Sequence, residues 1–194
     1  MHYAYTSSSR TFPVIHETFI GDAGATSGSE LVGGVNAHYH LHTKLVARTV
    51  YVKGDADALL NLLLHGGLDR RQARKYAGQW ISIPEGDKAY ASNAGGLTMR
   101  QLVHSLAPFG NLSIRSSTLH GEPVVDVHGS EGKGKQRWIY DLYAPANGRK
   151  LPLESDLRIP SDKSLDRIVL SKWDEGLHLS APAKSVPIST VRKS

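Results

Sequence analysis

The stretch QRWIYDLYAPANGRKLPLESDLRI (residues 136–159) decides the fold class, because it contains two alternating segments joined by a turn at residues 146–148. Alternate residues of each segment are mostly apolar, and Glu154, Asp156 and Arg158 lie between them in the second segment. The apolar positions are Trp138, Tyr140, Leu142 and Ala144 in the first segment and Leu151, Leu153, Leu157 and Ile159 in the second. One apolar face and one wet face are typical of an antiparallel sheet that is covered on a single side.

Further strands are expected on both sides of this hairpin. In the second half we expect strands near residues 112–119, 122–128, 136–144, 151–159 and 165–173, with turns between them. In the first half, residues 35–42 and 45–52 are expected to pair across a short link at Thr43–Lys44. Residues 11–20 fit an edge strand, because Pro13 cannot donate to a ladder. The Gly- and Ser-rich residues 21–34 are expected to form a turn or flexible loop.

Three short helices are expected between the two sets of strands. Asp55 can cap DALLNLLL, Asp69 can cap RRQARKYA, and Thr98 with Gln101 forms a capping-box pattern before a helix that Pro108 ends. The predicted fold is α+β: a strongly curved antiparallel sheet, or half-barrel, with a helical patch covering its concave apolar face. We divide the chain into an N-terminal edge strand and loop, residues 1–34, and a main region, residues 35–194, within a single domain.

Composition excludes several classes of protein and of site. The 194 residues include no cysteine, which excludes disulfides, thiolate metal sites and a cysteine nucleophile. No apolar run is long enough to span a membrane. The net charge is +5, but the basic residues are scattered, so we expect no nucleic-acid partner. Lys133, Lys135 and Arg137 are expected to lie in a solvated turn, with contact to an anionic membrane surface as the alternative.

No motif of a known catalytic or nucleotide-binding site is present. The chain has no GxSxG, no P-loop, no HExxH and no GxGxxG that opens a helix, so we predict no enzyme, no catalytic residue and no cofactor. Acidic residues on the expected strands should mostly face water; these are Asp126, Asp141, Glu154 and Asp156.

Three alternating histidines, His38, His40 and His42, share one face of an expected strand. Same-face neighbours are about 6.5–7 Å apart along a strand, which is too far for three ligands of one ion. We therefore expect a solvated polar face and predict no metal site. The alternative is a site in which two of the three act with His120 or His128.

The expected helices carry more apolar side chains than one sheet face requires, which favours a cavity between helices and sheet. Periodicity alone does not separate cavity lining from core. The candidate lining residues are Leu59, Leu60, Leu63, Leu64, Trp80, Met99, Leu102, Val103, Leu106, Trp138, Tyr140, Leu142, Leu151 and Leu153.

Several runs in the same order resemble the LolA-like lipoproteins of actinobacteria, which are related to the mycobacterial LppX/LprG group. They are VYVKGDADAL (50–59), ARKYAGQWISIP (73–84), GLTMRQL (96–102), LYAPANGRKLPLESDLRI (142–159), IVLSKWDEG (168–176) and HLSAPAKSVPI (178–188). The resemblance implies a half-barrel around helices with a hydrophobic cavity that carries or senses lipids. Family members begin with an export signal and a lipid-modified cysteine, and this sequence has neither.

The expected function is therefore non-enzymatic binding or transport of a lipid or lipidated molecule in the cell envelope. The alternative is an envelope-stress or regulatory module of the same fold that binds a protein and carries no lipid. The expected partner is a lipid or acylated ligand, and membrane contact stays open. We expect a monomer, exported from the cytoplasm, whose anchoring to the membrane is left open.

Overall fold

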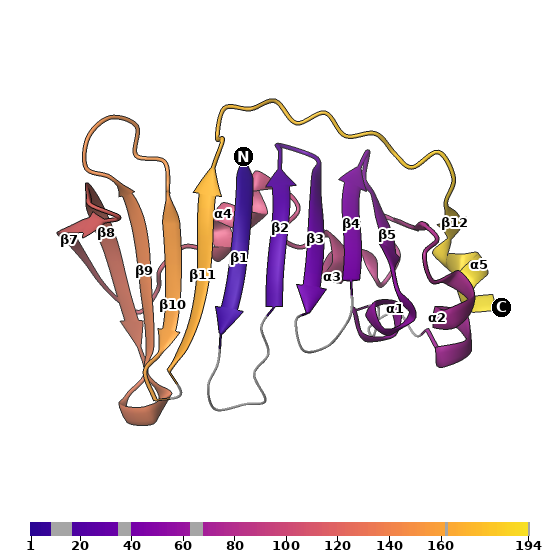
Figure 1. Ribbon diagram of the computed structural model, residues 1–194, viewed down its shortest axis with the longest axis horizontal. Helices are drawn as coiled ribbons and strands as arrows, with labels where there is room; N and C mark the ends of the chain where they lie inside the picture. Colours follow the sequence, from indigo (N-terminus) through magenta and orange to yellow (C-terminus); the bar gives the residue numbers. More distant parts are fainter. Residues whose placement is uncertain (9–16, 35–39, 63–67, 162, 194) are drawn as a thin grey trace.

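The computed structural model describes residues 1–8, 17–34, 40–62, 68–161 and 163–193, and Figure 1 shows their arrangement. These residues form one twelve-stranded sheet in the order β12-β6-β5-β4-β3-β2-β1-β11-β10-β9-β8-β7. The strands are β1 (His2–Ser8), β2 (Glu17–Ala23), β3 (Gly28–Gly34), β4 (His40–Val46), β5 (Thr49–Gly54), β6 (Ile81–Pro84), β7 (Asn111–Leu119), β8 (Glu122–Glu131), β9 (Trp138–Pro145), β10 (Glu154–Ile159), β11 (Ser164–Ser171) and β12 (Val186–Pro187). Only the pair of β12 with β6 is parallel, and the sheet is not closed: its edges are β12 and β7.

The helices of the described residues are short, and three of them begin where the sequence predicts. They are α1 (Ala56–Leu62), α2 (Arg70–Tyr76), α3 (Tyr90–Ala94), α4 (Met99–Ser105) and α5 (Ile188–Lys193). Asp55 accepts from the Ala58 amide at 2.8 Å, and Asp69 forms a complete capping box with Gln72. Thr98 caps α4. Sequence reasoning missed α3 and α5, which have no side-chain cap pattern and span only five and six residues.

The N-terminal residues form the middle of the sheet, which corrects the expectation of an edge strand followed by a loop. Strand β1 lies between β2 and β11, and residues 21–34 supply most of the β2–β3 hairpin. At Gly21 and Gly28 of this hairpin, other groups approach the backbone so closely that a side chain would not fit. A Cβ at Gly21 would lie 2.4 Å from the Tyr3 ring, and one at Gly28 would lie 1.8 Å from the Leu97 carbonyl oxygen. Close packing, rather than flexibility, therefore explains Gly21 and Gly28.

Two strand boundaries also differ from expectation. The β4–β5 turn is at Ala47–Arg48, both with positive φ, so Thr43 and Lys44 lie inside β4. Because neither Ala47 nor Arg48 is a residue that favours this conformation, local sequence carries no turn signal there. Strand β10 begins at Glu154, so residues 151–153 are outside it. Of the expected strand at 35–42, residues 35–39 lie outside the described part of the chain.

The core forms two clusters on one face of the sheet. The first joins β3–β6 to residues of α1, α2, α3 and α5, and the second joins α4 to β1, the end of β2 and β11. Figure 1 shows α3 and α4 behind the strands and the segment after β11 crossing the strand ends to β12. On the same face, Leu112 and Ile114 of β7 remain 60% and 76% exposed. The expected helical patch over the whole apolar face is therefore not confirmed, because the cover is partial.

Candidate functional site: an apolar groove beside α4

Helix α4 presents two apolar stripes that have different surroundings. Leu102 and Leu106 are four residues apart, are buried, and pack in one cluster with Tyr3 and Leu170 of the sheet. Met99 and Val103 form the neighbouring stripe, also four residues apart, and are only half-buried. The first stripe therefore attaches α4 to the sheet, whereas the second, of which Met99 also packs against this cluster, keeps part of its surface accessible.

The second stripe lines an apolar groove of about 760 Å³, which we call the α4 groove. Its lining residues are Ala25, Met99, Arg100, Val103, His104, Ala107, Leu151, Pro152 and Trp173. Two contacts hold its walls: the Met99 amide donates to the Gly24 carbonyl oxygen at 2.8 Å, and Trp173 Nε1 donates to the Pro152 carbonyl oxygen at 2.9 Å. The exposed side chains of Arg100 and His104 place positive or hydrogen-bonding groups at its rim.

Strand β9 places three more predicted residues on the same apolar face of the sheet. Tyr140 lies opposite Leu157 and Leu142 lies opposite Val127, so these pairs share a face, and Trp138 shares it by alternation. Phe109, shortly after α4, has its ring centroid 4.0 Å from that of Tyr140. Together with Leu112 and Ile114, these residues form an apolar surface over β7–β10, in which Leu142 packs against the second core cluster while Leu112 and Ile114 stay exposed.

The remaining predicted lining residues lie elsewhere. Leu59 is fully buried in the first core cluster and Leu60 packs against it. Leu102 and Leu106 belong to the second cluster. Leu63 and Leu64 lie outside the described residues, and Trp80 is on the opposite face of the sheet, where its ring contacts His42. Leu153 is half-buried, with its backbone bonded to Tyr143 and Leu170.

The structure thus brings Met99, Val103 and Leu151 together in the α4 groove. Sequence reasoning missed Pro152 and Trp173, which complete its wall. Both lie just outside strands, where alternation gives no information about the direction of a side chain. Their common place in the wall depends on a tertiary hydrogen bond, from Trp173 to the Pro152 carbonyl oxygen, which the sequence does not reveal.

A buried ion network occupies the other face of β7–β11, which corrects the expectation that its carboxylates face water. Asp126, Asp141, Glu154 and Asp156 are at most 5% exposed. Arg115 donates to Asp126 at 2.5 Å and to Asp141 at 2.8 Å. Arg158 also pairs with Asp141. Arg167 pairs with Glu154 and Asp156. His128 Nδ1 lies 2.6 Å from Asp141 Oδ1, and His120 Nε2 lies 3.1 Å from Glu154 Oε2. Because each of these carboxylates pairs with an arginine, we interpret the network as structural.

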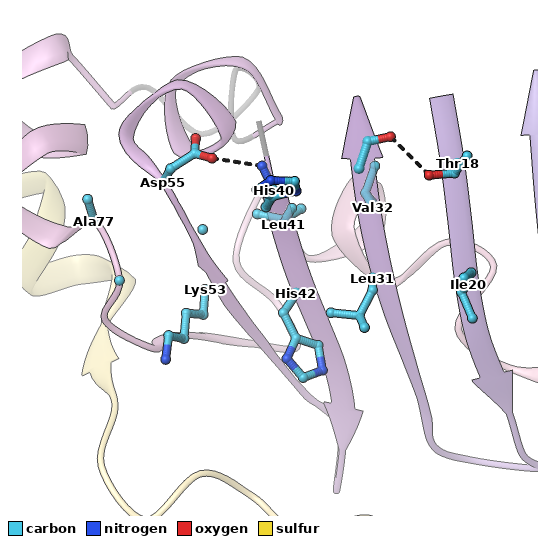
Figure 2. Close-up of a pocket in the computed structure, with 13 residues that line it drawn as sticks. Thr18, Ile20, Leu31, Val32, His40, Leu41, His42, Lys53, Asp55 and Ala77 are labelled. Carbon is cyan, nitrogen blue, oxygen red and sulfur yellow. Dashed lines mark hydrogen bonds between the residues drawn. The ribbon is translucent and has the colours of Figure 1, made fainter. Parts of the chain in front are cut away.

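A second groove, also of about 760 Å³, lies over β2–β5 and reaches Asp55 and Ala77 beside α1 and α2 (Figure 2). It is on the face opposite the two core clusters, which we call the helix-free face because the helices of the described residues pack in those clusters. Its lining includes Ile20, Leu31, His40, His42 and Lys53. The predicted histidines thus lie beside apolar residues rather than on a purely solvated face. Asp55 accepts from the His40 backbone amide at 2.7 Å. Within the described chain no group of three or more His, Asp or Glu residues could hold a metal ion, and His38 lies outside that chain.

Comparison with solved structures finds similarity to the crystal structure of the Mycobacterium tuberculosis lipoprotein LppX. The identity is 10%, the TM-score is 0.46, and the match covers 92% of this chain and 88% of that chain. No family model matches the chain, and no curated protein matches it significantly. A likeness at this level assigns neither family nor function, so the family resemblance stays a prediction. None of the helices described is both long and apolar enough to cross a membrane.

Proposed function

We propose that the protein binds an acyl chain of a lipid or lipidated molecule in the α4 groove and acts as a carrier or exchanger rather than an enzyme. One observation carries this proposal: Met99 and Val103 keep part of their apolar surface outside the core and line a groove of about 760 Å³. The size is in the range of small-molecule sites, which are mostly apolar with a few polar groups. Extracytoplasmic location and a monomeric state, both expected from sequence, stay predictions.

The driving force is burial of methylene groups. Each buried methylene contributes about 0.8 kcal/mol, so ten of them contribute roughly 8 kcal/mol before any cost is subtracted. Ordering of the chain and removal from a bilayer, which is also apolar, offset much of this. The protein would therefore exchange lipid with a membrane rather than hold it permanently. A phosphate head group would stay at the rim, within reach of the exposed Arg100 and His104.

Tryptophan fluorescence tests this site directly, because Trp173 lines the α4 groove and bromine quenches only nearby indoles. In a Trp80→Phe, Trp138→Phe variant, Trp173 is the only tryptophan. We expect a phosphatidylcholine with brominated acyl chains to quench it saturably. Val103→Trp in the parent chain fills the groove and should reduce the lipid that native mass spectrometry detects after purification at least tenfold. The matched change Val169→Trp, on an exposed position of β11, should not.

If Trp173 is not quenched and native mass spectrometry shows only the bare chain, the carrier function is wrong. The alternative is a regulatory module that binds a protein. One observation favours it: β7 is an edge strand that exposes Leu112 and Ile114, and such edges pair with other chains. Ile114→Lys would then abolish partner binding, whereas it should leave Trp173 quenching by lipid unchanged.

A further inference from the structure

The helix-free face carries an apolar row that the α4 groove does not use. The register places Ala4, Ile20, Leu31, His42 and Lys53 opposite one another across β1 to β5, and therefore on one face. Ile20 and Leu31 are 50% and 54% exposed. With strands about 4.8 Å apart, the distance from Ile20 to Lys53 is about 14 Å. We call the hollow along this row the open-face groove (Figure 2).

A missing side chain deepens the open-face groove at Gly33. A Cβ built there would have only the Thr18 hydroxyl oxygen at 3.4 Å and His40 Nδ1 at 3.7 Å as close neighbours, and the φ angle is ordinary for a strand. A side chain at this position would therefore project into the groove without a clash. Gly33 thus differs from Gly21 and Gly28, where packing leaves no room.

The charges of the open-face groove lie at one end only. Lys53 is exposed at that end, and Lys44 Nζ lies 5.4 Å from the centre of the Trp80 ring, which contacts His42. Within the described residues no ion pair involves Lys44 or Lys53. Burial, together with these two lysines, lowers the pKa of His42, so its ring is neutral at pH 7.

The carboxylates near the groove are already engaged. The two oxygens of Asp55 accept from the backbone amides of His40 and Ala58, and Asp22 pairs with His2. Asp55 keeps its negative charge, but Lys44 and Lys53 outnumber it, so this end carries a net positive charge, whereas the Ile20 end is aliphatic. This polarity matches a molecule with an anionic head and a single alkyl chain.

We propose that the open-face groove is a second ligand site, which binds a single-chain anionic amphiphile such as a fatty acid. The carboxylate lies at Lys53 and the chain runs across β4, β3 and β2 over Leu31 and Ile20. The proposal is independent of the α4 groove, because the two grooves lie on opposite faces and share no lining residue.

Monomeric 2-bromohexadecanoate is a suitable probe, because its bromine is next to the carboxylate and the chain has no cysteine for it to alkylate. In a Trp138→Phe, Trp173→Phe variant, which keeps Trp80, we expect saturable quenching. Lys53→Gln should weaken binding about threefold to tenfold, as should the uncharged 2-bromohexadecanol. Lys184→Gln, on an exposed residue of the C-terminal segment, is the matched control and should have no effect.

Gly33→Val should reduce binding at least tenfold by filling the groove, and Leu31→Glu should do so without changing a glycine. Equal binding of the acid and the alcohol, or no effect of Lys53→Gln, would overturn the anionic specificity. Quenching that needs anionic vesicles and is absent with the monomeric acid would overturn the site in favour of membrane docking. The Trp173 variant reports the α4 groove separately, so either site can fail alone.

Discussion

Replacing Asp141 by asparagine tests whether the buried ion network stabilises the fold. Asp141 has no exposed surface and accepts from Arg115, His128 and Arg158. Removing one partner of a buried ion pair costs about 3–5 kcal/mol. Here Arg115 keeps Asp126, and the side chain of Arg158 is 43% exposed and can be hydrated. We therefore expect a loss near the lower limit, about 3 kcal/mol, which is roughly 6–12 °C in Tm for a chain of this size.

The matched control is Asp174→Asn. Asp174 also pairs with an arginine, Arg149, at 2.6 Å, but both side chains are mostly exposed. An exposed pair contributes under about 1 kcal/mol. Urea unfolding of the two variants and the parent chain at pH 7 gives both free energies. If Asp141→Asn costs no more than Asp174→Asn, the network does not stabilise the fold and its structural interpretation is refuted.

The pH dependence gives a second measure of the same residue. Burial alone would raise the pKa of Asp141, but hydrogen bonds from His128 and Arg158 outweigh it and the pKa lies below its ordinary value. A carboxylate with a lowered pKa in the folded state stabilises the fold above its unfolded pKa of about 3.9. That contribution is lost as the pH falls through the lower, folded pKa. The difference between the parent and Asp141→Asn should therefore shrink below about pH 4, and a constant difference down to pH 2 would contradict the assignment.

Three further predictions use other parts of the molecule. Gly21→Ala should destabilise the protein by about 1–3 kcal/mol, because the new Cβ meets the Tyr3 ring. Gly33→Ala, measured in the same thermal unfolding experiment, should change the stability by under about 0.5 kcal/mol. Asp69→Ala should lower the free energy of unfolding in urea by about 1 kcal/mol, because it removes the α2 capping box. The control is Asp57→Ala in the first turn of α1, and a loss for Asp69→Ala no larger than for this control would contradict the prediction. Calorimetry with zinc at pH 7 should give dissociation constants well above micromolar, and sub-micromolar binding that His40→Ala abolishes would show that these histidines do form a metal site.

The extent to which the fold could be predicted depends on how local its causes are. The starts of α1, α2 and α4 were predictable, because Asp55, Asp69 and Thr98 cap their helices within three residues. The β7–β8 hairpin was also close to expectation. The role of residues 21–34 was not predictable, since Gly21 and Gly28 are required by Tyr3 and Leu97, which are distant in sequence. A Gly-rich segment looks the same whether it is flexible or tightly packed.

The candidate site shows the same limit at the level of single side chains. Helical spacing correctly placed Met99, Leu102, Val103 and Leu106 on an apolar side of one helix, but that side is wide enough to contain two stripes. Which stripe is core depends on where the sheet lies, and this is decided by β1 and β11 from the two ends of the chain. Leu102 and Leu106 are buried in one cluster with them, whereas Met99, at the margin of that cluster, and Val103 line the groove.

Strand alternation has a related weakness, because it separates two faces without saying which is buried. On the helix-free face, the residues of β8–β10 are charged yet buried, since Asp126, Asp141 and Glu154 are covered by their own ion partners. On the same face, Ile20 and Leu31 are apolar yet half exposed. One face therefore changes from a buried charged region to an exposed apolar one across the sheet. A sequence pattern that assumes one wet and one dry face misjudges both regions, and the second is where the open-face groove lies. The apolar residues that keep accessible surface are thus the ones that mark the two proposed ligand sites, Met99 and Val103 on one face and Ile20 and Leu31 on the other.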